Sequence, residues 1–345
     1  MTDGAQLGVR LRERDLTAAP ATLNLLESTT SADREQAAAL LHEVSPAKLA
    51  GEAQGHIIGV TGPPGAGKST LLSALLHEWR DTAPTPSRTA AAVPCPTAPD
   101  GDGRGRTVAM LAVDPSSRRS GGSLLGDRAR IEFDPADRGV FIRSTAAGER
   151  LGGLAWGTRA AAQALAAAFD VVVVETVGVG QAETEVAEVA DTVAVVVQPG
   201  GGDVLQFLKS GIMEIPDVLV VTKADLGQVA TSARRDLSAA LRSLGRRSTA
   251  VAAVSSLPPP AGIDELCGLL DEHWSLLTAD GGSELAARRL RARRAGALTD
   301  FAVEYGQRGV RALGGRRAAE RWLAEQDPAL DEAALAAALA GKISG

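Results

Sequence analysis

The chain has 345 residues and a formal net charge of −6, and 45% of its residues are hydrophobic but only 3% are aromatic. So much apolar sequence excludes a protein that is disordered throughout. The acidic balance argues against nucleic-acid partners, and the scarcity of aromatic residues argues against base-stacking surfaces. Two cysteines are too few for a disulfide framework, and no apolar run is long enough for a signal peptide or a membrane span. We therefore expect a cytoplasmic protein without a membrane partner.

Three regions follow one another along the chain. Residues 1–54 and 283–345 have apolar positions at helical spacing, which predicts helical extensions at both ends. Residues 55–278 alternate short β-branched runs with longer Ala- and Leu-rich stretches, which is typical of βαβ units. We predict an α/β fold with a mostly parallel central sheet covered by helices on both faces. The expected strands are 56–61, 107–113, 140–143, 171–175, 192–197, 218–222 and 249–254.

One segment, residues 81–106, breaks this rhythm. It is rich in proline and then in glycine and has no hydrophobic period. Such a composition predicts a flexible insertion between the first helix and the second strand of the predicted sheet.

The strongest motif is a phosphate-binding loop that fits G-x-x-x-x-G-K-[ST] at every fixed position. It follows the first expected strand and precedes an amphipathic stretch, 69–79, that predicts a helix. Its backbone N–H groups and the helix N-terminus favour phosphate, the Lys68 amine reaches the β- and γ-phosphates, and the Ser69 hydroxyl ligates magnesium. The nucleotide-binding residues predicted here are Gly62, Pro63, Pro64, Gly65, Ala66, Gly67, Lys68, Ser69 and Thr70.

A second motif indicates which base is bound. The run Thr222-Lys223-Ala224-Asp225 follows an expected strand and resembles the NKxD guanine motif of GTPases, with Thr222 in place of the usual Asn. Asp225 would accept two hydrogen bonds from guanine, whereas adenine offers no such donor pair, and the stem of Lys223 would cover the base. The loop after the last expected strand resembles the one whose backbone contacts guanine, and it contains Ser255, Ser256 and Leu257. The sequence therefore predicts GTP rather than ATP.

Acidic residues lie at or directly after the ends of two other expected strands. Asp114 and Glu175 would both face the nucleotide, because ligands of open parallel sheets lie beyond the carboxyl ends of the strands. Asp127 lies in a loop of small residues between them and is either a magnesium-linked acid or a charge on a helix surface. Gln181 follows a glycine-rich stretch and is a candidate for orienting the attacking water. The predicted magnesium ligands are Ser69, Asp114, Asp127 and Glu175, and the predicted catalytic residues are Lys68, Asp114, Glu175 and Gln181.

Together these motifs resemble one family. The strings GVTGPPGAGKSTL, LAVDPSSRRSGGSLLGDR, ETVGVGQAE, QPGGGDVLQFLKSGIMEI and VTKAD are similar to those of the MeaB/ArgK GTPases, in order over about residues 20–280. The resemblance implies a P-loop GTPase of the signal-recognition-particle type that acts as a metallochaperone-type assistant of an adenosylcobalamin-dependent acyl-CoA mutase. Cofactor loading and protection of the mutase, slow hydrolysis without the partner, and homodimers formed through the terminal extensions are further implications. Adenosylcobalamin would be met only through the mutase.

The family positions map residue by residue onto this chain. By motif position the resemblance assigns nucleotide and magnesium roles to Lys68, Ser69, Asp114, Asp127, Glu175 and Asp225. An alternative interpretation is a GTP- or ATP-dependent protein kinase linked to amino-acid transport, and a third is a nucleotide-binding scaffold that does not hydrolyse. The guanine motif and the lack of a recognisable acceptor-binding domain count against the kinase.

The C-terminal region contains a cluster of arginines at residues 288–294 on a predicted helix. This pattern predicts either a helical arm for dimerisation or mutase docking, or a basic face on a helix that packs against its own domain. The four histidines are scattered and none pairs with a cysteine at ligand spacing, so direct delivery of a metal ion by this chain is not expected.

Overall fold

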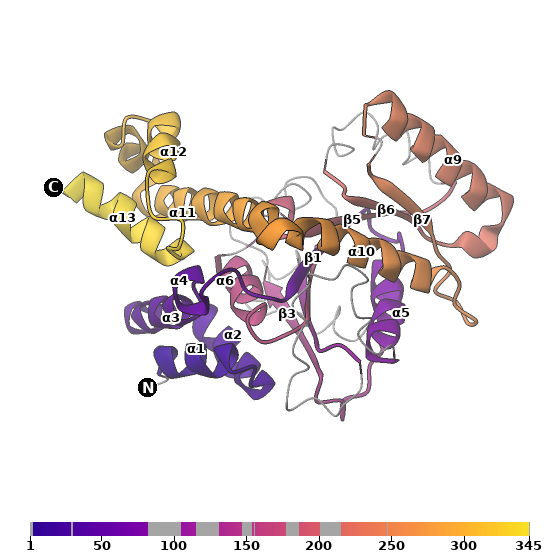
Figure 1. Ribbon diagram of the computed structural model, residues 1–345, viewed down its shortest axis with the longest axis horizontal. Helices are drawn as coiled ribbons and strands as arrows, with labels where there is room; N and C mark the ends of the chain where they lie inside the picture. The colour runs from indigo at the N-terminus through magenta and orange to yellow at the C-terminus, as the bar shows by residue number, and fades with distance from the viewer. Residues whose placement is uncertain are drawn as a thin grey trace. The chain divides into compact units, whose positions relative to one another are not determined.

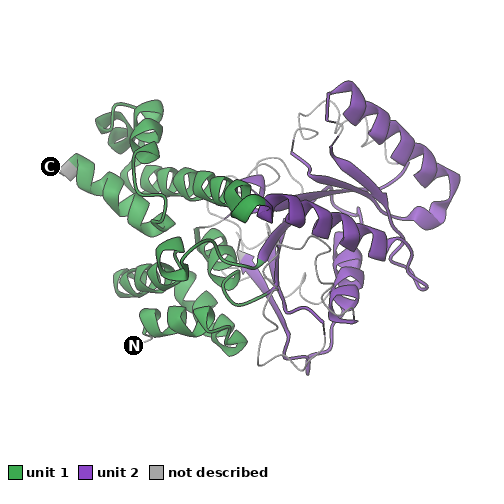
Figure 2. Ribbon diagram, viewed as in Figure 1, with its two compact units in different colours: residues 1–55, 156–169, 280–345 green, residues 56–155, 170–279 purple. Residues whose placement is uncertain are grey.

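The computed structural model describes residues 3–28, 30–81, 105–114, 131–146, 154, 156–176, 186–200, 215–246 and 248–344. The chain forms two compact units, which Figure 2 distinguishes by colour. Unit 1 contains residues 1–55, 156–169 and 280–345, and unit 2 contains residues 56–155 and 170–279. The domain limits expected from the sequence, 1–54, 55–278 and 283–345, stay a prediction.

Unit 2 is built on a parallel β-sheet. Its seven strands, counted over the described residues, are hydrogen-bonded in the order β3-β2-β4-β1-β5-β6-β7, and all six neighbouring pairs are parallel. The α/β class is confirmed and every expected strand is present, although the third continues to Ala146 rather than ending at 143. The strands are β1 (His56–Thr61), β2 (Val108–Asp114), β3 (Val140–Ala146), β4 (Val171–Thr176), β5 (Thr192–Val197), β6 (Val218–Val221) and β7 (Ala250–Ala253).

Helices cover the two faces of this sheet (Figure 1). On one face, α5 (Lys68–Asp81) and α10 (Ile263–Thr278) share an apolar cluster with alternate strand residues such as Ile58 and Val60. Because β2 and β7 lie on opposite sides of the strands that precede them, right-handed crossovers put α5 and α9 (Gln228–Ser243) on opposite faces. Strands β1, β4, β5 and β6 are buried along their whole length, as this double cover requires.

The strand order determines where a ligand can bind. The chain passes from β1 through α5 to β2 on one side, whereas β5 pairs with β1 on the other side. Such a change of direction leaves a crevice at the carboxyl ends of the neighbouring strands. The loop after β1 lies at this point.

The ends of the proline-rich insertion are held together by described residues. The N–H of Arg106 donates to the carbonyl of Trp79 at 2.8 Å, and the guanidinium of Arg80 donates to the carbonyl of Arg106 at 3.0 Å. The same buried guanidinium forms two hydrogen bonds of 2.7 Å to Asp137. The chain therefore leaves after residue 81 and returns at residue 105 at neighbouring points. Residues 82–104 lie outside the described part.

Unit 1 is helical, as predicted for both ends of the chain. Within the described residues no helix of either unit is long and apolar enough to cross a membrane. The helices are α1 (Gly4–Arg12), α2 (Ala19–Leu26), α3 (Ser31–Glu43), α4 (Pro46–Leu49), α6 (Trp156–Leu165), α11 (Ser283–Ala312), α12 (Arg316–Ala324) and α13 (Glu332–Ser344).

The arginine cluster of α11 is used inside unit 1. Arg289, which is 6% exposed, donates to the carbonyls of Ala53 at 2.5 Å and Gly55 at 2.6 Å. Arg293 is 5% exposed and contacts both Glu52 and the carbonyl of Pro328. These two side chains fit the alternative of a face packed against its own domain, rather than a free docking surface.

A charged cluster is buried where three helices of unit 1 meet. Arg159 of α6 forms ion pairs with Asp300 of α11 and Glu332 of α13. Glu332 is 2% exposed and lies against Gly296, where a Cβ would come within 2.4 Å of the carboxyl carbon. Burial raises the pKa of Glu332 to about 8 and also raises the pKa of Asp300. The single guanidinium of Arg159 can balance the charge of only one of the two carboxylates. One of the two carboxyl groups, Asp300 or Glu332, is therefore protonated and neutral near pH 7.

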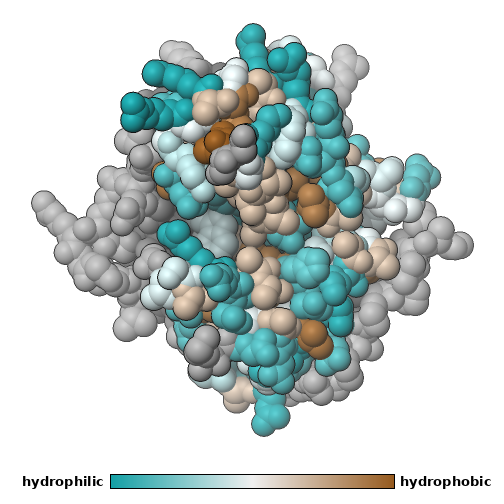
Figure 3. Space-filling view, turned by 90° about the vertical axis from the view of Figure 1, so that its left-hand side faces the viewer, coloured by the Kyte–Doolittle hydropathy of each residue, from teal (hydrophilic) through white to brown (hydrophobic). Residues whose placement is uncertain are grey.

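The surface of unit 1 mixes apolar and hydrophilic residues. Helix α13 buries Leu335 and Leu339 in the C-terminal core, while Ala337 is exposed. Figure 3, seen from the side on which Figure 1 marks both chain ends, shows several separate apolar patches among hydrophilic residues. The prediction of a homodimer through the terminal extensions is not tested by this surface.

Candidate functional site

The phosphate loop joins the buried end of β1 to the first turn of α5. Gly62, Gly65 and Gly67 have φ values of 147°, 77° and 88°, a region that residues with a Cβ rarely adopt. At Gly62 a Cβ would also come within 2.1 Å of the carbonyl oxygen of Val196. The loop can therefore turn as tightly as a phosphate cradle requires only with glycine at these positions.

The amine of Lys68 lies inside this loop. It donates to the carbonyls of Gly62 at 2.8 Å and Pro63 at 3.2 Å, and the residue is 7% exposed. Ser69 and Thr70 follow in the first turn of α5, next to the amide groups at its N-terminus. The positive charge, the helix amides and the Ser69 hydroxyl are thus collected at one end of the helix, which is the arrangement that binds phosphate.

The residues of the predicted base motif are connected to this loop. The Thr222 hydroxyl donates to the carbonyl of Ala66 at 2.7 Å and has a second contact with the carbonyl of Val197 at 3.1 Å. Lys223 has a left-handed backbone with φ 54°, and its ammonium donates to Gln198 Oε1 at 2.6 Å and to the Gly65 carbonyl at 3.4 Å. Thr222 was predicted as a nucleotide contact, and here its hydroxyl is bonded to the protein backbone.

The other residues predicted to contact the nucleotide base lie at the ends of β6 and β7. The Ser255 hydroxyl donates to Asp225 Oδ1 at 3.1 Å, and the N–H of Ala224 donates to the carbonyl of Val254 at 3.0 Å. Asp225 is exposed, and Leu257 is 59% exposed. The predicted carboxylate and the loop that contains Ser255, Ser256 and Leu257 are therefore neighbours, with an apolar side chain open to a ligand.

The acidic residues lie at the carboxyl ends of β4 and β2, on the other side of β1. Glu175 is 7% exposed and lies in register with Val60 of β1 and Ala112 of β2. Val171 and Val173 of β4 belong to the apolar cluster that contains α5. Glu175 lies two residues after Val173, so its side chain is on the same face of the sheet, where α5 begins. Asp114 ends β2, the strand beside β4. The Asp114 side chain and the whole of Asp127 and Gln181 lie outside the described residues.

The oxygen donors that are described fit magnesium. The Ser69 hydroxyl and the Glu175 carboxylate are hard oxygen ligands, and both lie where β1 and β4 approach the N-terminus of α5. Over the described ranges, no three His, Cys, Asp or Glu side chains form a metal-binding group. Magnesium is usually held by one or two protein oxygens together with phosphate and water. Burial raises the pKa of the Cys267 thiol to about 12, so this thiol stays protonated and is a poor metal ligand.

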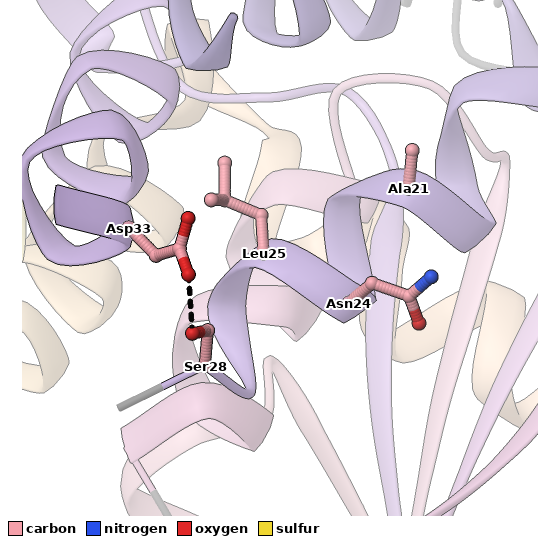
Figure 4. Close-up of a pocket in the computed structure, with 5 residues that line it drawn as sticks. All are labelled: Ala21, Asn24, Leu25, Ser28 and Asp33. Atoms are coloured by element: carbon pink, nitrogen blue, oxygen red, sulfur yellow. Dashed lines mark hydrogen bonds between the residues drawn. The ribbon is translucent and has the colours of Figure 1, made fainter. Parts of the chain in front are cut away.

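A small pocket lies within unit 1. It has a volume of about 240 Å³ and lies between α2 and α3. Ser28 donates to Asp33 at 2.6 Å, and Figure 4 shows these two side chains facing each other while the amide of Asn24 points away from them. Hydrogen bonds from Ser28 and Thr30 lower the pKa of Asp33, and Thr30 also caps α3. Ser28, Thr30 and Asp33 are thus bonded to one another at the capped N-terminus of α3.

No role follows from the sequence for Gln198, which contacts Lys223 of the predicted base motif. Gln198 begins the string QPGGGDVLQFLKSGIMEI, but the string does not show its partner, which depends on which loop the fold brings beside it. The contact with Lys223, 25 positions later in the chain, becomes visible only when the ends of β5 and β6 are seen side by side.

Comparisons with known proteins agree with this geometry. The family described as methylmalonyl-CoA mutase-associated GTPase MeaB matches residues 19–90 and 102–306. A putative GTPase of Pyrococcus abyssi is 39% identical over 279 residues, which cover 79% of this chain and 76% of that protein. The mitochondrial methylmalonic aciduria type A homolog of Mus musculus is 34% identical over 284 residues, or 77% of this chain and 61% of that protein. A solved structure of a LAO/AO transport system kinase covers 94% of this chain and 98% of its own, with a TM-score of 0.60 and 26% identity.

Proposed function

Because the chain belongs to the MeaB family of methylmalonyl-CoA mutase-associated GTPases, we propose that it hydrolyses GTP to assist an adenosylcobalamin-dependent acyl-CoA mutase. Methylmalonyl-CoA mutase or a close relative is the proposed partner, and the name of the mouse relative supports it. The observation that carries the nucleotide part is the glycine loop around Lys68, which is hydrogen-bonded to the base motif through Thr222.

Phosphate binding is proposed for the loop and the N-terminus of α5. An incoming phosphate oxygen would replace the carbonyls of Gly62 and Pro63 as the partner of the Lys68 amine. Amides of the loop and of the first helical turn would donate to the remaining oxygens. This exchange holds the positive charge where negative charge develops during transfer of the γ-phosphoryl group to water.

Base selection is proposed for Asp225. Its carboxylate would accept from guanine N1–H and the exocyclic amine, while Ser255 holds one of its oxygens at 3.1 Å. Adenine would leave that carboxylate without donors, which disfavours it by roughly 1–3 kcal/mol.

A bound magnesium ion would neutralise part of the charge on the phosphates. Ser69 and Glu175 are its proposed ligands among the described residues, directly or through water, and Asp114 and Asp127 are proposed from the sequence motifs. Gln181 is proposed to orient the attacking water.

The kinase alternative is not favoured. The name of one solved relative mentions a transport system kinase, but the guanine motif and its link to the phosphate loop support a GTPase. Gating of cofactor loading, protection of the mutase, the homodimer and a cytoplasmic location remain proposals that rest on the family.

Co-purification tests the proposed partner directly. The tagged chain would be mixed with candidate adenosylcobalamin mutases in the presence of GDP, of GTP or of a non-hydrolysable GTP analogue. We expect capture of one mutase in an amount that depends on the nucleotide, and we expect Lys68→Ala to lose that dependence. Failure to capture any candidate mutase with any nucleotide would contradict the proposed partner.

A further inference from the structure

We propose that Gln198 is a positioning residue of the base site, which holds the ammonium of Lys223 so that the lysine stem forms the surface under the base. This inference rests on the proposed binding of GTP. The lysine stem would pack on the face of the base, whereas Asp225 is proposed to bind the donors at its edge.

The contact itself is short. Gln198 directly follows β5, and its Oε1 accepts a hydrogen bond of 2.6 Å from the Lys223 ammonium. The other contact of that ammonium, with the carbonyl of Gly65, is 3.4 Å long. Charged hydrogen bonds of normal strength measure about 2.7–2.9 Å, so Gln198 is the closer and stronger of these two acceptors.

The backbone from which the Lys223 side chain extends is held in place by its neighbours. Lys223 adopts φ 54°, and its neighbours on both sides are bonded to other elements. The Thr222 hydroxyl is bonded to Ala66, and the N–H of Ala224 is bonded to the carbonyl of Val254. The Cα of Lys223 is held in this way and its ammonium is held by Gln198. The methylene stem between them therefore extends from the end of β6 to the end of β5.

Fixing both ends matters because a lysine side chain is otherwise flexible. A free lysine on the surface samples many rotamers, and a ligand that packs on it must bear the entropy of ordering it. A stem that is already ordered presents a flat apolar strip to a planar ring at lower entropic cost. Such a strip packs on the face of any purine and does not read its edge.

Two paired substitutions test this role. Gln198→Met has nearly the same shape but no acceptor, whereas Gln198→Glu keeps an acceptor for the ammonium. Fluorescent GDP and IDP would be titrated, because inosine lacks the exocyclic amine that Asp225 is proposed to bind. We expect Gln198→Met to weaken both nucleotides by about 3–10-fold with an unchanged GDP/IDP ratio, and Gln198→Glu to remain within about twofold of the unaltered protein. In turnover assays, Gln198→Met should raise KM for GTP and leave kcat within about twofold.

A double-mutant cycle separates positioning from a general structural effect. Lys223→Met removes the ammonium, so in that background Gln198→Met should change the affinity by less than about twofold. Thermal unfolding of every variant checks that it is folded. Equal nucleotide affinity for Gln198→Met and the unaltered protein, or equal losses with and without Lys223, would overturn the inference while the proposed function stands. If the unaltered chain binds no guanine nucleotide, the proposed function is overturned and the inference with it.

Discussion

The hydroxyl of Thr222 donates a hydrogen bond of 2.7 Å to the carbonyl of Ala66, so the end of β6 is bonded to the phosphate loop. Both residues are buried, Thr222 at 3% and Ala66 at 0% exposure. The second contact of the same hydroxyl, with Val197, adds the end of β5 to this connection. The loop proposed to hold the phosphates and the motif proposed to recognise the base are therefore parts of one hydrogen-bonded assembly.

Thr222→Val tests this connection. Valine has almost the same shape but cannot donate, so the buried carbonyl of Ala66 loses this hydrogen bond. We expect the free energy of unfolding to fall by about 1–2 kcal/mol and GDP affinity to fall several-fold. Urea denaturation and nucleotide titration measure the two effects. Thr222→Ser keeps the hydroxyl and is the matched control, so equal losses in Thr222→Ser and Thr222→Val would argue against the hydrogen bond as the cause.

Asp225→Asn tests the proposed recognition of guanine. The amide that replaces one carboxylate oxygen is a donor, and xanthine offers an acceptor where guanine has its amine. We expect the preference to shift from GTP toward XTP by about tenfold or more. Competition between the two nucleotides for the purified variant measures the shift. An unchanged affinity for GTP would show that Asp225 does not contact the base.

The buried cluster around Arg159 predicts a pH dependence of unit 1. The pKa of Glu332 is raised from its ordinary 4.5 to about 8, so the folded state binds a proton that the unfolded state releases. The resulting stabilisation is fully present below about pH 4.5 and is lost as the pH rises through about 8. The charged neighbours are Arg159 and Asp300, with Glu304 acting on Asp300.

Glu332→Gln is neutral at every pH and can still bond to both partners. Between pH 6 and pH 9 we expect the unaltered protein to lose about 2 kcal/mol of stability that this variant retains. Amide hydrogen exchange of α13 measures this loss of stability within unit 1. Glu325→Gln makes the same chemical change at an exposed position and serves as the control. Parallel pH profiles for the unaltered protein and Glu332→Gln would contradict the shared-proton account.

We expect the fold to tolerate removal of the insertion, residues 82–104. Because the N–H of Arg106 is bonded to Trp79 and Arg80 is bonded to Asp137, the two ends of the segment are held by unit 2 itself. Replacing residues 82–104 by a short Gly/Ser linker should therefore shift the melting temperature by no more than about 2–3 °C. Arg80→Met, which breaks the contact with Asp137, should destabilise the protein clearly in the same thermal assay. A shortened chain that fails to fold would show that the insertion contributes to the fold.

The fold was largely predictable because its signals are local. Runs such as residues 171–174 and 193–197 are apolar throughout, which is typical of a strand covered on both faces. The phosphate loop is contiguous, so its residue types and spacing are visible in a single string.

Side-chain partners were not predictable, because they join residues far apart in the chain. Arg159 and Glu332 are separated by 173 positions, and Arg289 reaches the carbonyl of Ala53 over 236 positions. The arginine cluster is visible in the sequence as a charge pattern. Every residue has a backbone carbonyl, however, so the sequence does not show which carbonyl an arginine will contact. The same holds for Gln198, whose partner depends on the pairing of β5 with β6.

Equilibrium titration of the purified chain with GTP and ATP, in the presence of magnesium, tests the central claim most directly. We predict that GTP binds at least tenfold more tightly than ATP, that Lys68→Ala loses GTP binding or lowers turnover by about 100-fold or more, and that Lys48→Ala on unit 1 changes neither. Equal binding of ATP and GTP, or unchanged binding and turnover in Lys68→Ala, would contradict the account of this chain as a GTPase.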